Sequence, residues 1–188
     1  MVAAKRAVAL FLIAFGIAMA IAALADKNWV DQRDLDGLYG TYRIGLTEWE
    51  IVNSQNGNCP SYDLDNAGSP PCEWAPSLLG NQDDWKSAGQ GALGIGAIAV
   101  IVLGFAGIFN LVNLCLPAFT KVPAALLAFF SGVAFFIGAL VYEGMRPSWG
   151  GDMGYNHPIG LYLAAGLMGE IAAIVLWSAD YIKDSVKA

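Results

Sequence analysis

The sequence predicts a membrane protein: one four-transmembrane-helix bundle, formed by residues 1–188 as a single domain, with a small extracellular antiparallel β-sheet cap. The first observation is composition, since 56% of the 188 residues are hydrophobic and only 14% are charged, which is unusual for a soluble domain. The second is that the apolar residues are concentrated in four blocks, each near the ~20 residues that a helix needs to cross a bilayer. The third is a polar, acidic loop between the first two blocks. The four blocks cover residues 7–25, 88–112, 122–141 and 158–177.

Basic residues near the ends of these blocks orient the chain. Four spans place both termini on one side of the membrane, and basic residues in short flanking segments stay on the cytoplasmic side. The residues concerned flank the first and last blocks and the short connection between the second and third: Lys5, Arg6, Lys121, Lys183 and Lys187. We therefore expect an integral protein of the plasma membrane with cytoplasmic N- and C-termini, and outer loops at residues 26–87 and 143–157.

The outer side of the chain is acidic. Loop 26–87 contains eleven acidic and four basic residues, in a chain whose net charge is −6. Negative charge argues against nucleic acid as a partner and favours cations or a basic partner. Membrane lipids are expected partners of the four spans.

The first block also fits a second interpretation. Lys5-Arg6, an apolar run and then Ala23-Leu24-Ala25 before Asp26 are compatible with a cleaved secretory signal. However, the run over residues 7–25 is longer than the ~7–15 apolar residues that such signals use. We interpret the block as a retained first span.

The first half of the long outer loop changes from helical to alternating periodicity between Trp29 and Ile51. One face of this alternation would carry Leu38, Gly40, Tyr42, Ile44 and Leu46, and the other Tyr39, Thr41, Arg43, Gly45, Thr47 and Trp49. Aromatic and β-branched residues in alternation predict strands. Asn56-Gly57 predicts a tight turn, so a small antiparallel sheet is expected here.

Two of the three cysteines lie in this outer loop. Cys59 and Cys72 are flanked by Pro60, Pro70 and Pro71, and an oxidising exterior would join them in a disulfide bond. Closing that loop would stabilise the cap by roughly 3 kcal/mol in the chain-entropy model. Cys115 is separate, at the inner end of the second span.

The segment that begins at Asp63 can be compared with a calcium-binding loop, which needs oxygen ligands at positions one, three and five and Glu at position twelve. Here position five is Ala67 and position twelve is Trp74. A solvated acidic turn is therefore the preferred interpretation, and we predict no metal site.

The spans differ in their small and aromatic residues. The second contains Gly89, Gly91, Gly94, Gly96, Gly104 and Gly107, and the fourth contains Gly160, Ala164, Ala165, Gly166, Gly169 and Ala173. Small residues let helices approach closely in lipid, so these two helices are expected to pack inside the bundle, with an oligomer contact as the alternative. The third contains Phe129, Phe130, Phe135 and Phe136, interpreted as lipid-facing or core residues.

Glu170 lies in the middle of the fourth span. Intramembrane acids are energetically expensive and by default suggest a functional site. No basic residue lies at a comparable position in the other three spans. We expect Glu170 to be protonated, to bond a hydroxyl or amide group, or to contact another subunit.

The chain lacks the residue patterns of the common enzyme classes. His157 is the only histidine, which excludes haem held by paired histidines and histidine-based zinc sites within one chain. There is no Cys-x-x-Cys pair, no Gly-x-Ser-x-Gly and no P-loop. We predict a protein that is not an enzyme and carries no cofactor.

The architecture, with two cysteines in the long first outer loop, resembles the claudin and peripheral-myelin-protein superfamily, which includes channel gamma-type auxiliary subunits and fungal Sur-type tetraspans. The family pattern is an early Trp, then Gly-Leu-Trp, then two cysteines. Trp29 matches the first element, and Cys59 and Cys72 match the last. Gly-Leu-Trp matches loosely, either at Gly37-Leu38-Tyr39 or at Gly45-Leu46 with Trp49 two positions late. The chain is therefore interpreted as a distant relative.

The resemblance implies a left-handed four-helix bundle whose cap sheet takes one strand from the second outer loop. It also implies palmitoylation of Cys115. Two functions follow from it: a structural or adhesive tetraspan of the cell-junction type, or an auxiliary subunit of an ion channel, transporter or larger membrane complex. Residues 185–188 lack the apolar ending by which claudins bind scaffolds. Either function implies a homo-oligomer or a larger membrane-protein complex.

Overall fold

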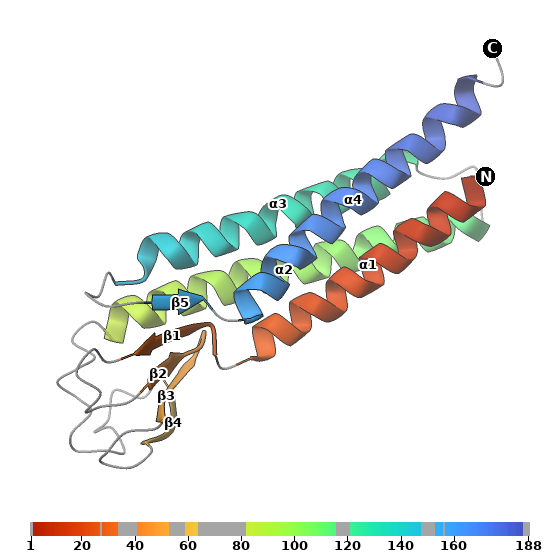
Figure 1. Ribbon diagram of the computed structural model, residues 1–188. Coiled ribbons are helices and arrows are strands. Elements are labelled where there is room, and N and C mark those ends of the chain that lie inside the picture. Colours follow the sequence, from red (N-terminus) through yellow and green to blue (C-terminus); the bar gives the residue numbers. More distant parts are fainter. Residues whose placement is uncertain are drawn as a thin grey trace. The chain divides into compact units, whose positions relative to one another are not determined.

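The computed structural model describes residues 2–26, 28–33, 41–52, 59–63, 82–115, 121–147, 153–155 and 157–185. The described residues form four helices and five strands (Figure 1). The helices are α1 (Val2–Ala25), α2 (Gln82–Cys115), α3 (Lys121–Met145) and α4 (His157–Ser185). The strands are β1 (Val30–Arg33), β2 (Thr41–Ile44), β3 (Glu48–Val52), β4 (Cys59–Asp63) and β5 (Met153–Tyr155).

The four predicted spans are confirmed as helices. Each helix contains a segment that is long and apolar enough to cross a membrane, and these segments include the predicted blocks. The helices extend beyond the blocks because their ends have favourable polar residues. Asp83 and Asp84 occupy the first turn of α2, where carboxylates interact favourably with the helix dipole. Pro158 is the second residue of α4, where proline costs no hydrogen bond.

The chain divides into two compact units, and all four helices contribute to both. Unit 1 contains residues 1–22, 95–137 and 161–188. Unit 2 contains residues 23–94 and 138–160. The bundle contacts around Glu170 lie in unit 1, and the β-sheet lies in unit 2.

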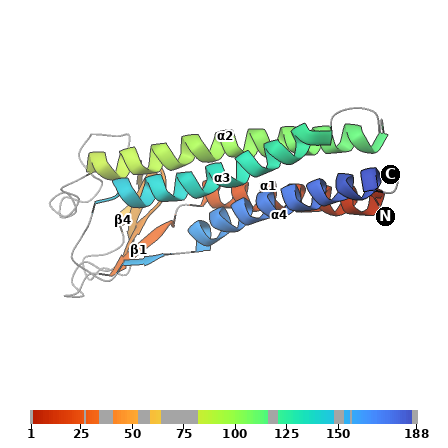
Figure 2. The same ribbon diagram turned by 90° about the horizontal axis from the view of Figure 1, so that it is seen from above.

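In unit 1 each helix contacts two neighbours. Gly107 of α2 faces Ile13 of α1, and Ser131 of α3 donates a hydrogen bond to the Ala99 carbonyl of α2. Gly16 of α1 faces Met168 of α4, and α4 passes in front of α1 in the view of Figure 2. The contact between α3 and α4 is made by Gly132, Gly166 and Gly169. These close backbone contacts confirm the predicted intramolecular packing for Gly166 and Gly169, whereas a Cβ at Gly160 would meet nothing within 4 Å.

Large apolar side chains on the outside of unit 1 point away from the helix contacts. Phe11 of α1, Phe105 of α2, Phe130 of α3 and Ile174 of α4 are all exposed. Apolar patches of this extent on every helix are typical of a surface that faces lipid or another protein. Of the four phenylalanines in the third span, Phe129 and Phe130 are exposed and Phe135 is buried, so the predicted core role is confirmed for Phe135 and lipid contact stays a prediction for the exposed pair.

In unit 2 the strands form one antiparallel sheet in the order β4-β3-β2-β1-β5. β1 pairs with β2 on one side and with β5 on the other. β5 comes from the predicted second outer loop, so the strand that the family resemblance implied is present. Both predicted outer loops therefore contribute to one sheet (Figure 1).

One face of the sheet is buried and the other carries charge. Val30, Ile44 and Trp49 are buried, whereas Asp31 and Arg43 are half-buried on the opposite face. The predicted faces were wrong for Trp49, which the alternation placed with Arg43. The chain reverses at residues 45–47, where the Gly45 amide donates to the Glu48 carbonyl at 2.8 Å. Because of this turn, Trp49 lies directly opposite Ile44. The alternation of faces along one strand therefore does not continue from β2 into β3.

Candidate functional site

Trp29 connects the start of the sheet to two helices. Its indole Nε1 donates a hydrogen bond of 2.8 Å to the Ala23 carbonyl, in the last turn of α1, where backbone carbonyls have no partner within the helix. Its ring lies 5.1 Å from the ring of Tyr142 on α3. Such tilted aromatic pairs contribute about 0.5–1.5 kcal/mol beyond their buried area. The early tryptophan of the family pattern is therefore a structural residue here.

Trp85 completes an aromatic cluster with Trp29 and Tyr142, which we call the cap base. Its ring lies 6.5 Å from that of Tyr142, and all three side chains are fully buried. The three residues come from the segment before β1, the first turn of α2 and the C-terminal half of α3. The cap base thus joins the sheet to the helix ends within unit 2.

The turn between β2 and β3 packs against α2. Gly45 and Leu46 are buried, and the Leu46 carbonyl oxygen lies so close to Gly89 that a Cβ there would overlap it. Only glycine leaves room for this approach. The Gly45-Leu46 alternative of the family motif therefore occupies a packed position, with Trp49 buried beside it. Gly37, Leu38 and Tyr39 lie outside the described residues.

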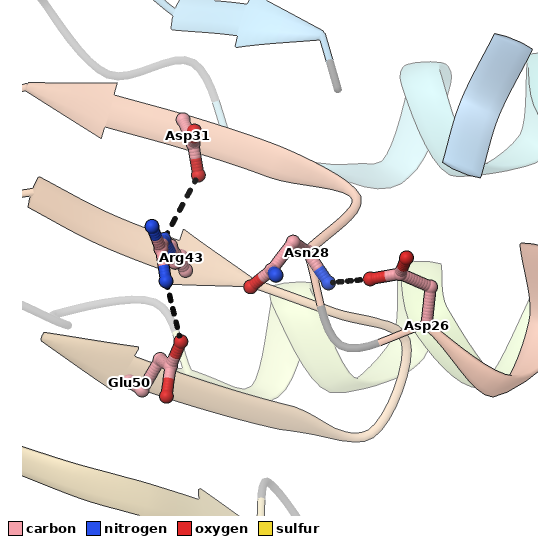
Figure 3. Close-up of polar contacts among 5 residues, drawn as sticks. All are labelled: Asp26, Asn28, Asp31, Arg43 and Glu50. Atoms are coloured by element: carbon pink, nitrogen blue, oxygen red, sulfur yellow. Dashed lines mark hydrogen bonds and ion pairs between the residues drawn. The ribbon is translucent and has the colours of Figure 1, made fainter. Parts of the chain in front are cut away.

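The other face of the sheet carries a row of three charges, Asp31, Arg43 and Glu50, which we call the charged row. These residues are direct partners across β1, β2 and β3. Arg43 Nη1 lies 3.2 Å from Glu50 Oε1, and Arg43 Nε lies 3.9 Å from Asp31 Oδ1 (Figure 3). The Arg43 side chain is 38% exposed, so these pairs add little stability. The ion pairs instead fix the positive charge of Arg43 between the two carboxylates.

A short turn positions the charged row relative to α1. The Asn28 amide donates to Asp26 Oδ1 at 2.9 Å (Figure 3), which is the side-chain-to-backbone bond typical of turns at aspartate. This turn leads from the end of α1 into β1. It brings Trp29 to the buried side and Asp31 to the charged side of the sheet.

Glu170 lies against α3 at the place where that helix has no side chain. A Cβ added to Gly132 would lie 2.7 Å from Glu170 Oε1 and 2.9 Å from the Gly166 carbonyl oxygen. The Glu170 residue is half-buried. Within the described part of the chain it makes no hydrogen bond and no ion pair. The predicted hydroxyl or amide partner is therefore not found among those residues.

Sequence reasoning missed a polar contact between α1 and α2. Arg6 Nη1 donates to the Asn113 carbonyl at 2.6 Å, and Asn110 Nδ2 donates to the Arg6 carbonyl at 2.9 Å. All three residues are buried. The signal was available, because Asn110 and Asn113 are amides inside an apolar block. Arg6, predicted only as a topology signal, also contributes to packing.

Several predicted residues cannot be placed. Cys59 belongs to β4, where its backbone lies opposite Ile51, but its side chain, Cys72, the acidic turn after Asp63 and the side chain of Cys115 lie outside the described residues. The disulfide bond therefore stays a prediction, which peptide mass spectrometry without reductant would test. Palmitoylation of Cys115 also stays a prediction. Among the described residues no group of three or more His, Cys, Asp or Glu side chains could hold a metal ion.

Comparison with known proteins adds no relative: no family model and no curated protein matches the chain.

Proposed function

We propose that this chain is a non-enzymatic, claudin-like tetraspan of the plasma membrane that acts in adhesion or in the assembly of membrane proteins, by presenting its sheet to a partner. The observation that carries this proposal is the two-sided construction of the sheet. One face is buried by Trp49, Ile44 and Val30, and the other bears the charged row.

The construction suits recognition because the charged row is held by buried neighbours. The strands come from both predicted outer loops, and the turn at Leu46 and the cap base connect them to helix ends. A preorganised surface loses less entropy on binding than a flexible loop does. Charge patterns at interfaces mainly determine specificity and association rate, so a partner is expected to present a complementary row.

The test is co-purification from native membranes in mild detergent. Arg43→Glu replaces the central positive charge and leaves three acidic side chains in line, so we expect recovery of the partner to fall about tenfold, the effect of roughly 1.4 kcal/mol. Arg43→Lys is the matched control, because it keeps the charge, and recovery should stay close to that of the wild type. Intrinsic tryptophan fluorescence of both variants reports whether the cap base is intact.

Equal recovery with Arg43→Glu and the wild type would overturn the proposed role of the charged row. Adhesion and assembly are then separated by reconstitution. An adhesive protein should aggregate two vesicle populations that each contain it, with loss of aggregation in the Arg43→Glu variant. An assembly protein should instead require its partner in the same bilayer.

The alternative function, an auxiliary subunit of a channel, transporter or larger complex, is favoured by a different observation. The Glu170 carboxyl group has no hydrogen-bond or ion-pair partner among the described residues, although it lies mid-span. A polar group in that environment stabilises contact between helices when a neighbouring helix supplies its partner. Glu170 therefore supports lateral contact, whereas the charged row supports contact outside the membrane.

A further inference from the structure

We infer that Glu170, which packs against Gly132, forms a docking site for a transmembrane helix of a different protein, one that carries a lysine or arginine near its middle. This inference rests on the lateral contacts of the proposed function. It goes further because it names the occupant by its chemistry.

The first argument is the position of the carboxyl group. Glu170 lies near the middle of the membrane-crossing segment His157–Ser178, where an acid is costly without a partner. The absence of a side chain at Gly132 lets the Glu170 carboxyl group pack there, since a Cβ would lie 2.7 Å from Glu170 Oε1. The backbone holds this position, because Gly169 approaches the Gly132 Cα and Gly166 approaches the Gly132 carbonyl oxygen.

The second argument is that α4 exposes apolar side chains next to Glu170. Leu167, Ile171 and Ile174 lie one turn or less from Glu170 on α4, and all three are exposed, Ile174 to 67%. Residues spaced by three and four positions share one face of a helix. A neighbouring helix that packs on this face would therefore reach the carboxyl group of the half-buried Glu170.

The third argument is that these polar donors of unit 1 are engaged elsewhere. Ser131 precedes Gly132 but donates to the Ala99 carbonyl at 2.8 Å. Asn110 donates to the Arg6 carbonyl, and Arg6 donates to the Asn113 carbonyl. Lys5 donates to Ser178 at 3.3 Å. Each donor is used in a helix contact, and none of the described ones reaches Glu170.

The fourth argument selects the occupant. Over residues 7–22, 95–112, 122–137 and 161–177, every exposed residue is apolar, and Glu170 is the one polar residue of those described segments that is not buried. A second copy could therefore offer only its own Glu170, and two carboxylates at one site disfavour each other's ionised form. A basic side chain from another protein complements the charge.

The test uses a synthetic helix of defined composition. The purified full-length chain, labelled with a donor dye, is reconstituted into phosphatidylcholine vesicles with an acceptor-labelled polyleucine helix of about 20 residues. One form of the helix has a central lysine and the other a central leucine. Energy transfer should show that the lysine helix binds the wild-type chain about tenfold more tightly than the leucine helix does. Glu170→Gln should remove this preference.

A variant with the acid at another position tests whether binding of the lysine helix depends on the position of Glu170 or only on the presence of an acid within the membrane. The double variant Glu170→Leu, Ile174→Glu keeps one acid on the same exposed face but moves it one turn away from Gly132. We expect its preference for the lysine helix to fall at least several-fold. Circular dichroism of the reconstituted variants checks that the helices remain formed. If the double variant misfolds, the preference of the wild-type chain for the lysine helix and its loss in Glu170→Gln still test the inference.

Three outcomes would overturn the inference. The wild type could bind both helices equally, the relocated acid could bind the lysine helix as well as the wild type does, or acid-dependent energy transfer could occur between copies of the chain. Arg43→Glu should bind the lysine helix like the wild type. If the wild-type chain shows no preference for the lysine helix but Arg43→Glu still lowers recovery of the native partner, the docking site alone is rejected. If the preference is present but Arg43→Glu does not lower recovery of the native partner, the role of the charged row alone is rejected.

Discussion

At the scale of single residues, the missing side chain of a glycine decides where backbones meet. α2 contains glycines in two different environments within unit 2. At Gly89 a Cβ would overlap the Leu46 carbonyl oxygen, whereas at Gly94 an added Cβ would meet nothing within 4 Å. Both residues lie in the same helix. Only the first is required by packing.

We therefore predict that Gly89→Ala destabilises the protein and Gly94→Ala does not. The added methyl at Gly89 must displace backbone at the turn between β2 and β3, which costs about 1–3 kcal/mol for overpacking of this kind. Alanine at Gly94 lowers the conformational entropy of the unfolded chain, so the substitution is expected to be neutral or stabilising. Thermal unfolding in detergent, followed by tryptophan fluorescence, measures both. A Gly89→Ala variant as stable as Gly94→Ala would contradict the described approach of Leu46.

At the scale of secondary-structure elements, polar side chains join helices through backbone carbonyls. Asn110 on α2 donates to the Arg6 carbonyl on α1, and Arg6 returns a bond to the Asn113 carbonyl. Ser131 on α3 donates to the Ala99 carbonyl on α2. Without a hydrophobic driving force between helices in lipid, such bonds and close packing determine which helices pair.

Replacing Asn110 should therefore weaken the pairing of α1 with α2. Asn110→Ala removes the donor to Arg6 and leaves that carbonyl with its bond inside the helix, so we expect a loss of about 0.6–1.7 kcal/mol, the range for hydrogen bonds between membrane helices. Stability against a denaturing detergent measures the change. Leu111→Ala on the exposed side of α2 is the matched control. A similar loss in both variants would show that side-chain volume, rather than the hydrogen bond, stabilises this contact.

At the scale of the whole molecule, the number of spans constrains topology. Four helices are long and apolar enough to cross a membrane. If all four cross it, the chain returns to its starting side and the acidic sheet-forming loops lie on the other side. Lys5 and Arg6 support cytoplasmic termini through the positive-inside rule, although both also bond to neighbouring helices. The orientation remains a prediction.

Epitope tags test that orientation directly. Tags at the N- and C-termini should be protected from protease added to intact cells and digested after permeabilisation, because both ends are predicted to be cytoplasmic. A tag inserted after Gly68, in the predicted outer loop, provides the accessible control. Digestion of the C-terminal tag in intact cells would mean that the first helix is cleaved off or that one span does not cross.

The sequence by itself determined the number of helices, their approximate positions and the presence of strands in the first outer loop. These features are local, because an apolar run of ~20 residues is selected by the thickness of the bilayer and an alternating run by the geometry of one strand. The acidic start of α2 and the proline at the start of α4 were predictable for the same reason. Glu170 stood out because polar residues inside a span are rare.

Only the tertiary structure decided which residues meet. Trp49 joined Ile44 on the buried face because a turn at residues 45–47 reverses the chain. Gly89 met Leu46, and Gly132 met Glu170, across 43 and 38 positions of sequence. Such contacts depend on how elements pack, and a periodic pattern records only which face of an element is apolar. The sequence could therefore locate Glu170, while the absence of a nearby donor among the described residues became visible only once the neighbouring helices were in place.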